Sequence, residues 1–249
     1  MNKVLNLYKR KGETPLACIE RFRDTHKEYI DVPMTYAGRL DPIAEGVLLV
    51  LAGEERYEKN KYLALGKEYV VKVLFGFSTD TYDILGEVMT QVDTVPNKKE
   101  IEMQSKFFIG TYDQTYPPYS SKTVNGKPLF RFARDGALHT IERPKRSVTV
   151  GGIVLNNYEK QSGDIILEII KSRVADVKGD FRQEVIAKRW EDVIDVNKKY
   201  VEATFTIHCS SGTYVRTIVH ELGQRLGIPA CILELKRIRV GNYSVEDSE

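Results

Sequence analysis

An aspartate on a short loop is the side chain in this sequence best placed to do chemistry. Asp41 stands in GRLDPIAEGVL, residues 38–48, directly before an apolar run that predicts a buried strand. Because Pro42 fixes its own φ and restricts the residue before it, Asp41 would project from a stiff support at the rim of a sheet. A carboxylate held there can act as a nucleophile or stabilise positive charge. Taken alone, an Asp-Pro pair more often forms an Asx-type turn that only caps its own loop.

Five segments, in one order along the chain, resemble the TruB family of pseudouridine synthases. Residues 38–48 are similar to the family's G-x-L-D-P-x-A-x-G-x-L signature. The other segments are KEY at 67–69, TDTYDILG at 79–86, PPYSSKTVNGKPL at 117–129 and CSSGTYVRT at 209–217. Together they are far more specific than any one motif. The resemblance implies the pseudouridine synthase fold and an enzyme that isomerises a uridine in RNA to pseudouridine without a cofactor or metal.

The resemblance also assigns roles to residues. It implies that Asp41 is the catalytic carboxylate and that Arg216, in the first turn of a helix after Gly212, pairs with it. A guanidinium can hold a carboxylate in bidentate geometry and keep it ionised. Tyr69 would stack on the target base, although a core tyrosine is the usual reading in an apolar strand. Removal of the C5 proton by a phenol of pKa about 10 fits less well. Leu235 matches an apolar residue of the family's uracil pocket, and core packing explains it nearly as well.

Two residues near Asp41 depart from the family's pattern. Tyr36 stands where the family usually has a histidine that occupies the gap left by the flipped nucleotide. Tyrosine is also flat, and we expect it to take over that role. Arg39 replaces the usual small residue and could touch phosphate or support Asp41. Lys9 and Gly12 resemble the family's N-terminal K-P-x-G element, and we expect them to be structural.

Basic residues gather near aromatic ones, which suits phosphate contact combined with base stacking. They are Lys122, Lys127, Arg131, Arg134, Arg143, Lys145, Arg146, Lys236, Arg237 and Arg239. The alternative is an ordinary solvated surface. The resemblance implies that the partner is the T-arm of tRNA, and that the target is the uridine conventionally numbered 55. Such a base must leave the stack before its glycosidic bond can be reached, and structured RNA is recognised by shape and phosphate contact. Among the basic residues, Lys122 and Lys127 are our candidate substrate contacts.

The composition is that of an ordinary globular protein. The 249 residues carry a net charge of +2, with 42% hydrophobic and 29% charged residues. No apolar stretch approaches the roughly 20 residues that span a bilayer, and residues 1–13 are too polar for a signal peptide. Three distant cysteines argue against a disulfide framework, and four scattered histidines give no zinc-ligand spacing. We therefore expect a cytoplasmic protein without a metal and, by default, a monomer.

Hairpins and helices alternate without a regular βαβ pattern, which predicts one α+β domain over residues 1–249, with a mixed, mostly antiparallel sheet and flanking helices. Strands are expected at 4–8, 46–51, 68–77, 85–91, 148–155, 165–171, 201–208 and 233–240, and a loop at 111–127. Helices are expected at 15–29, with Leu16, Ile19 and Phe22 buried, at 97–110, and from Gly212 to Gly227.

Residues from about 172 to 199 are expected to be a helical insertion relative to bacterial TruB proteins. A helix capped by Asp180 and running to Ile194 would cover one edge of the sheet. Its apolar side would consist of Phe181, Val185, Ile186, Trp190 and Val193. Because the sequence ends soon after Tyr243, we expect it to lack the C-terminal, often PUA-type, RNA-binding domain that family members commonly carry.

Two other functions are compatible with these residues. One is a non-catalytic RNA-binding or RNA-folding protein with the same fold; the change at Tyr36 leaves it open, whereas the retained Asp41, Tyr69 and Arg216 argue against it. The other is a pseudouridine synthase that acts on another RNA, which only a survey of substrates would separate.

Overall fold

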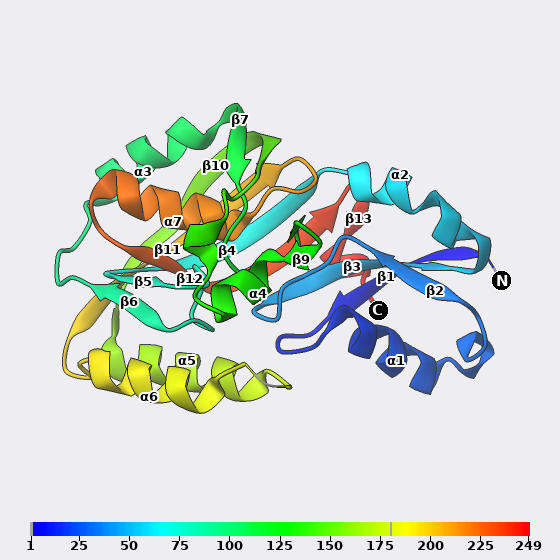
Figure 1. Ribbon diagram of the computed structural model, residues 1–249, viewed down its shortest axis with the longest axis horizontal. Coiled ribbons are helices and arrows are strands. Elements are labelled where there is room, and N and C mark those ends of the chain that lie inside the picture. Colours follow the sequence, from blue (N-terminus) through cyan, green and yellow to red (C-terminus); the bar gives the residue numbers. More distant parts are fainter. Residues whose placement is uncertain (1, 180) are drawn as a thin grey trace.

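The computed structural model describes residues 2–179 and 181–249 (Figure 1). Asp180, which the sequence indicates as a helix cap, lies outside the described residues. Within them, one sheet has nine strands: β1 (Lys3–Lys9), β2 (Met34–Ala37), β3 (Ala44–Ala52), β4 (Lys67–Phe75), β7 (Gly110–Thr115), β10 (Lys145–Ser162), β11 (Lys199–Cys209), β12 (Ala230–Val240) and β13 (Tyr243–Ser244). Two small sheets pair β5 (Phe77–Thr79) with β6 (Val88–Gln91) and β8 (Thr123–Val124) with β9 (Lys127–Pro128). The α-helices are α1 (Pro15–Thr25), α2 (Lys59–Ala64), α3 (Lys98–Ser105), α4 (Leu129–Arg134), α5 (Gly163–Asp176), α6 (Gln183–Val193) and α7 (Val215–Leu226).

The large sheet is mixed and mostly antiparallel. Its strands follow the order β1-β3-β12-β4-β11-β10-β7, with β2 beside β3 and β13 beside β12. Of its described strand pairs, β3 with β12 is parallel and the others are antiparallel. This architecture confirms the α+β fold class that the sequence predicts.

Helices cover both faces of the central strands, with α3 and α7 on one side and α5 and α6 on the other (Figure 1). Alternation along β11 buries Val201, Phe205 and Ile207 in the same cluster as the apolar stripe of α7. Gly227, at φ +65°, ends α7 as its spacing predicts. None of the described helices is both long and apolar enough to cross a membrane.

Helix α1 begins as predicted, but its buried side differs. The hydroxyl of Thr14 accepts a hydrogen bond from the Ala17 amide, and Pro15 occupies the first turn. Ile19 and Phe22 are buried, whereas Leu16 is 58% exposed. The prediction for Leu16 was wrong because Cys18, rather than Leu16, completes the stripe that faces β1 and β3.

Two segments adopt a different structure from the one expected. Residues 165–171 form part of α5, not a strand, although the run is rich in isoleucine. Its buried residues Ile166, Ile170 and Val174 recur every four positions, the period of a helix that packs on one side. In the segment expected to be a loop, residues 110–115 form the edge strand β7, which pairs with β10.

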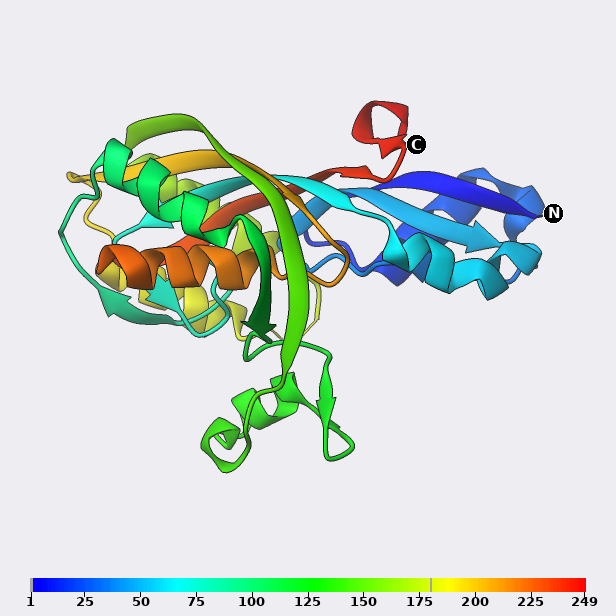
Figure 2. The same ribbon diagram turned by 90° about the horizontal axis from the view of Figure 1, so that it is seen from above.

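Two long excursions leave hairpins of the sheet. Thr115 pairs with Lys145, so residues 116–144 leave the β7–β10 hairpin and project from the body of the molecule (Figure 2). Ser162 pairs with Lys199, so residues 163–198 leave the β10–β11 hairpin and form α5 and α6. We call these the 116–144 excursion and the two-helix excursion. The second covers a face of the sheet with one apolar cluster, rather than the edge that the sequence suggested.

Trp190 of α6 packs in this apolar cluster. Its side chain is fully buried and donates from Nε1 to the carbonyl of Ile84 at 3.1 Å. Its neighbour Ile186 is buried too, whereas Val185, expected on the same apolar side, is 56% exposed.

We expect the Trp190→Phe variant to lose about 2–3 kcal/mol of unfolding free energy, because the carbonyl of Ile84 loses its donor and the smaller ring leaves a cavity. Urea denaturation measures this change. Val185→Ala, on the exposed side of the same helix, is the control and should change stability by less than about 0.5 kcal/mol. Equal losses in the two variants would contradict this account.

Candidate active site

Two buried cations hold the loop that carries Asp41. Arg237, only 1% exposed, donates from Nε to the Val47 carbonyl at 2.8 Å and from Nη2 to the Gly38 carbonyl at 3.0 Å. Lys9, also buried, donates from Nζ to the Ala44 carbonyl at 2.6 Å. Its burial lowers the pKa of the ammonium to about 8. Both ends of the loop and its middle are therefore fixed by ionic donors.

The loop also needs close backbone approach. At Gly46, where φ is +103°, a Cβ atom would lie 2.2 Å from the carbonyl oxygen of Arg237. A second backbone contact lies at the other side, where the amide of Gly12 donates to the Pro42 carbonyl at 3.0 Å. Lys9 and Gly12 are thus structural supports of the loop, in line with the expectation from the sequence.

Arg216 meets Asp41 from the first turn of α7. Its Nε lies 2.8 Å from Oδ2 of Asp41, and the guanidinium is 4% exposed while the carboxylate is 32% exposed. Nη1 donates to the Thr81 carbonyl at 2.7 Å and Nη2 to the Tyr119 carbonyl at 3.1 Å. Residues from four separate segments of the chain are thereby joined at one guanidinium.

The start of α7 is itself fixed by a side chain of the edge strand β7. Gln114, which is buried, accepts from the Tyr214 amide at 2.8 Å and donates to the Tyr214 carbonyl at 3.1 Å. This pair of bonds fixes the backbone two residues before Arg216. Gln114 of the sheet therefore helps to orient the Arg216 side chain, in addition to the groups that bind its guanidinium.

A second carboxylate, Asp83, approaches the same guanidinium. Its Oδ2 lies 3.8 Å from Nε of Arg216, while Oδ1 accepts from the Thr81 hydroxyl at 2.7 Å and the Leu85 amide at 3.0 Å. Burial raises the pKa of Asp83 to about 6, although Arg216 opposes that rise. For Arg216, burial alone would lower the pKa, but the charges of Asp41 and Asp83 outweigh it and the pKa is raised.

Sequence reasoning missed the roles of Asp83 and Arg237. Asp83 lies inside the quoted segment TDTYDILG, where a second aspartate near a turn was the available signal. Arg237 was grouped with surface basic residues, but its side chain is buried and bound to carbonyls. The signal for burial was its place two residues after Leu235, on the buried side of β12.

Tyr69 and Leu235 contribute an apolar floor. Tyr69 on β4 lies opposite Arg237 of β12, and Leu235 pairs with Ala44 of β3. Both side chains are buried in one cluster with Leu40, the residue before Asp41. Burial raises the pKa of the Tyr69 phenol, and the opposing effect of the nearby Arg237 does not offset it.

Other predicted contacts lie elsewhere or are already engaged. The half-buried ring of Tyr36, on β2, packs against the cluster of β1 and α1, with the Lys59 ammonium 5.5 Å from its centroid. Lys127 is paired with Asp135 at 2.5 Å. Arg39 is exposed and donates to the Ser121 hydroxyl at 2.7 Å, which links the Asp41 loop to the 116–144 excursion.

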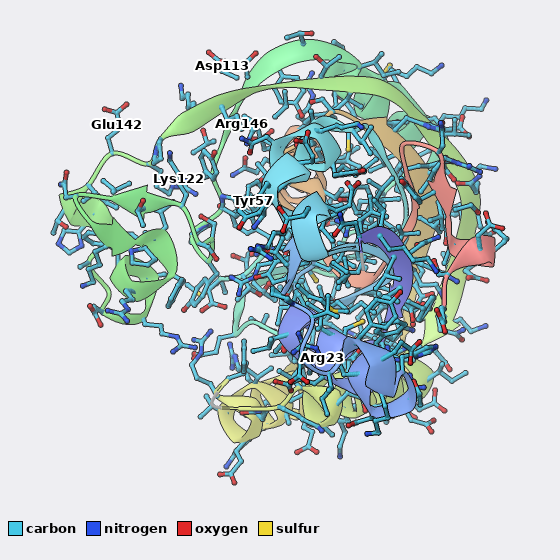
Figure 3. The ribbon with its side chains drawn as sticks, turned by 90° about the vertical axis from the view of Figure 1, so that its right-hand side faces the viewer. Arg23, Tyr57, Asp113, Lys122, Glu142 and Arg146 are labelled. Carbon is cyan, nitrogen blue, oxygen red and sulfur yellow. The ribbon has the colours of Figure 1, made fainter. Side chains whose placement is uncertain are left out.

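Lys122 is exposed, and its ammonium lies 5.7 Å from the ring centroid of Tyr116. In Figure 3, Lys122 and Arg146 lie on the side of the molecule from which the 116–144 excursion projects. Arg146 also covers Gly212, where an added Cβ would lie 2.3 Å from its guanidinium carbon.

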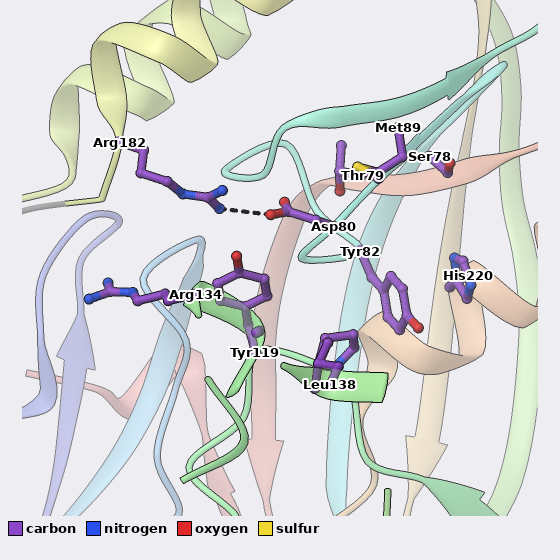
Figure 4. A pocket seen from close by; sticks show the side chains of 12 residues that line it. Ser78, Thr79, Asp80, Tyr82, Met89, Tyr119, Arg134, Leu138, Arg182 and His220 are labelled. Atoms are coloured by element: carbon purple, nitrogen blue, oxygen red, sulfur yellow. Dashed lines mark hydrogen bonds and ion pairs between the residues drawn. The ribbon is translucent and has the colours of Figure 1, made fainter. Parts of the chain in front are cut away.

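A pocket of about 620 Å³ lies between the 79–86 turn and the 116–144 excursion (Figure 4). It is lined by Tyr119, whose carbonyl binds Arg216, and by Asp80, Tyr82 and His220. The rings of Tyr82 and His220 stack with centroids 3.8 Å apart. Burial lowers the pKa of His220 to about 4, so the imidazole is neutral at physiological pH. Asp41 does not line this pocket, and the geometry at the ion pair is the better guide to chemistry.

In residues 2–179 and 181–249, no group of three or more histidine, cysteine, aspartate or glutamate side chains is arranged to hold a metal ion. The three cysteines are buried and unpaired with one another. What the arrangement offers is an oriented carboxylate beside a guanidinium, over an aromatic and aliphatic floor. Such a site can stabilise a cationic centre or attack a carbon atom.

Comparison with solved structures gives the same fold. The chain superposes on Cbf5 in a Cbf5–Nop10–Gar1 complex with a TM-score of 0.59 at 20% identity, covering 97% of this chain and 49% of that one. A structure of an H/ACA ribonucleoprotein bound to a substrate RNA containing 2′-deoxyuridine gives a TM-score of 0.56 at 19% identity. The chain spans about half the length of these two matched chains.

Comparison with sequences identifies the family. The family model described as the N-terminal domain of TruB family pseudouridylate synthase matches residues 32–178. The tRNA pseudouridine synthase B of Limosilactobacillus reuteri is 30% identical, over 100% of this chain and 70% of that protein. Its counterpart from Chlamydia abortus is 32% identical, over 98% of this chain and 84% of that protein. This chain therefore belongs to the TruB family of pseudouridylate synthases, which confirms the family and the enzyme class predicted from its motifs.

Proposed function

We propose that this chain converts the uridine conventionally numbered 55 in the T-arm of tRNA to pseudouridine, with Asp41 as the nucleophile. The observation that carries the proposal is the 2.8 Å ion pair between the buried Arg216 and the partly exposed Asp41. Relatives named tRNA pseudouridine synthase B, which match nearly the whole chain, support tRNA as the substrate class.

The two oxygens of Asp41 are not equivalent. Oδ2 is bound by Arg216, whereas Oδ1 has no hydrogen-bond partner within the described residues. Arg216 orients the carboxylate, and Oδ1 is the oxygen available to react. In the isomerisation the C1′–N1 bond breaks, the base turns and a C1′–C5 bond forms. C5 loses a proton and N1 gains one, so neither oxidant nor reductant is required.

Tyr69 and Leu235 fit the role of a platform for the flipped uracil. Because burial raises the pKa of Tyr69, its side chain stays a neutral phenol at physiological pH and is a poor base. A neutral aromatic ring can still stack on the base. Tyr36 has less support as a group that enters the RNA, since its ring would first have to leave the cluster of β1 and α1.

RNA binding is assigned to the 116–144 excursion and its base. Lys122 and Arg146 are exposed cations there, available to phosphates. Lys127 is a weaker candidate, because its ammonium is already paired with Asp135 and lies 4.8 Å from the ring of Phe132. Arg39 would act by holding the Asp41 loop against Ser121 in this excursion.

Asp83 is proposed as a positioning residue that, like Asp41, approaches Nε of Arg216. A buried carboxylate with a raised pKa favours its neutral form in the folded protein. Physiological pH lies above this pKa of about 6, so Asp83 is mostly charged there. The carboxylates of Asp41 and Asp83 then both face the guanidinium of Arg216.

Replacing Asp41 with asparagine removes the nucleophilic charge and keeps the side chain's shape. We expect pseudouridine formation in a tRNA transcript to fall by about 10³-fold or more, with the RNA dissociation constant within about threefold of wild type. Chemical mapping of pseudouridine and filter binding measure the two quantities. Asp113→Asn, at an exposed position of β7, is the matched control and should retain full activity.

Two outcomes would overturn the proposal. If Asp41→Asn still forms pseudouridine at the wild-type rate, Asp41 is not the nucleophile. If the wild-type protein binds tRNA but forms no pseudouridine in it, the chain is an RNA-binding protein with this fold or modifies another RNA.

Asp83→Asn tests the raised pKa. The folded pKa of about 6 exceeds the ordinary value of 3.8, so the stability contributed by Asp83 is fully present below about pH 4 and is lost as pH rises through 6. The asparagine variant lacks this titration. Its unfolding free energy relative to wild type should therefore increase between pH 4 and pH 7, by about 1–3 kcal/mol. Urea denaturation across that range measures it, and a difference that does not vary with pH would contradict the raised pKa.

A further inference from the structure

The two-helix excursion touches both the loop that carries Asp41 and the 79–86 turn, which binds Arg216. Its apolar face shares one buried cluster with Ile43, two residues after Asp41, and with Ile84, the residue after Asp83. Trp190 adds a hydrogen bond to the Ile84 carbonyl. Because protein interiors are close-packed, a shift of this helix pair would also displace the Asp41 loop and the 79–86 turn.

Arg182 extends this contact to the Arg216 side of the site. Its guanidinium lies 2.9 Å from Asp80, inside the 79–86 turn, and 2.8 Å from Glu87, the residue directly after it. It also lies 5.3 Å from the ring centroid of Tyr119 (Figure 4). Asp80 in turn accepts a hydrogen bond from the Glu87 amide at 2.9 Å, which closes the turn.

The groups that Arg182 touches are those that bind Arg216, or their immediate neighbours. The carbonyl of Thr81, next to Asp80, accepts from Nη1 of Arg216, and the carbonyl of Tyr119 accepts from Nη2. Arg182 has φ +61°, a left-handed backbone conformation that a non-glycine residue seldom adopts. The side chain is thus held at this place in spite of an unfavourable backbone, as happens where surrounding contacts fix a conformation.

The C-terminal part of α5 reaches the Asp41 side of the site. Arg173 of α5 lies 2.6 Å from the carboxylate of Glu234. Lys11 lies 3.2 Å from the same carboxylate. Lys11 also lies 3.4 Å from Glu45, a residue of the Asp41 segment. At Gly12, whose amide binds the Pro42 carbonyl, an added Cβ would lie 2.2 Å from the carbonyl oxygen of Asp176.

We propose that the two-helix excursion is a clamp for the ion pair, and that Arg182 is its positioning residue for the reaction. Arg182 fixes the 79–86 turn and Tyr119, and through their carbonyls it fixes the guanidinium of Arg216. This inference rests on the proposed function. An RNA contact is disfavoured at Arg182, because its guanidinium is already paired with the carboxylates of Asp80 and Glu87.

The test compares Arg182→Gln, Arg182→Lys and wild type in the full-length chain. Lys171→Gln is the matched control, since it also removes a cation from an ion pair of the excursion, but its partner Glu191, at 2.6 Å, lies on α6 and not in the turn. The measurements are the single-turnover rate of pseudouridine formation in a T-arm transcript, the dissociation constant for that transcript, the melting temperature, and amide hydrogen exchange over residues 79–87.

We expect Arg182→Gln to lower the rate about tenfold, since a small misplacement of Arg216 is costly in the transition state. The dissociation constant should stay within about twofold, and exchange over residues 79–87 should become faster. Arg182→Lys should recover most of the rate, and Lys171→Gln should match wild type in every measurement.

The clamp is wrong if Arg182→Gln keeps both the wild-type rate and the wild-type exchange. It is also wrong if the loss falls on RNA affinity, if lysine fails to restore the rate, or if Lys171→Gln loses as much. A wild-type protein that forms no pseudouridine refutes the proposed function instead. Hydrogen exchange then decides the clamp: faster exchange over residues 79–87 in Arg182→Gln alone supports it, and unchanged exchange overturns it.

Discussion

A buried guanidinium has to find an acceptor for its donors and a countercharge, and Arg216 imposes that constraint on the whole molecule. Leaving such a group unpaired inside a protein costs several kcal/mol, so the chain must bring partners to it. They come from distant segments: the Asp41 loop, the 79–86 turn and Tyr119 of the 116–144 excursion. The contacts that satisfy the buried guanidinium are therefore the same contacts that assemble the site.

The same principle explains the stiffness of the Asp41 loop. Carbonyl groups at its two ends and near its middle accept bonds from Arg237 and Lys9, both removed from water. Charge-assisted bonds of this kind are stronger than neutral ones, and breaking one would leave a buried charge unpaired. The carboxylate of Asp41 keeps one oxygen directed to Arg216 while a third of its surface remains open to solvent. Rigid support below and access above are what a nucleophile requires.

The sequence supports some of these conclusions and not others, for physical reasons. The Asp41 loop and the start of α7 have strong local signals, an Asp-Pro pair that follows Gly38 and a Gly–Thr–Tyr helix entry, and they lie as the motifs suggest. Asp83 and Arg237 depend on burial, which is decided by packing between segments far apart in sequence. From the neighbouring sequence alone, Asp83 resembles an ordinary turn aspartate and Arg237 resembles one member of a basic run. The isoleucine-rich residues 165–171 favour a strand locally, but the open face of the sheet needs a helical stripe to cover it.

The central claim is that a uridine leaves its RNA stack and presents its glycosidic bond to the carboxylate held by Arg216. The most direct measurement is a crystal structure of the Asp41→Asn protein bound to an unmodified T-arm stem-loop. The account predicts that the target uridine lies outside the stack, with its base against Tyr69 and its C1′ atom within about 3.5 Å of the side chain at position 41. A target uridine that stays stacked in the RNA loop, or whose base enters the pocket beside Tyr82 and His220, would contradict it.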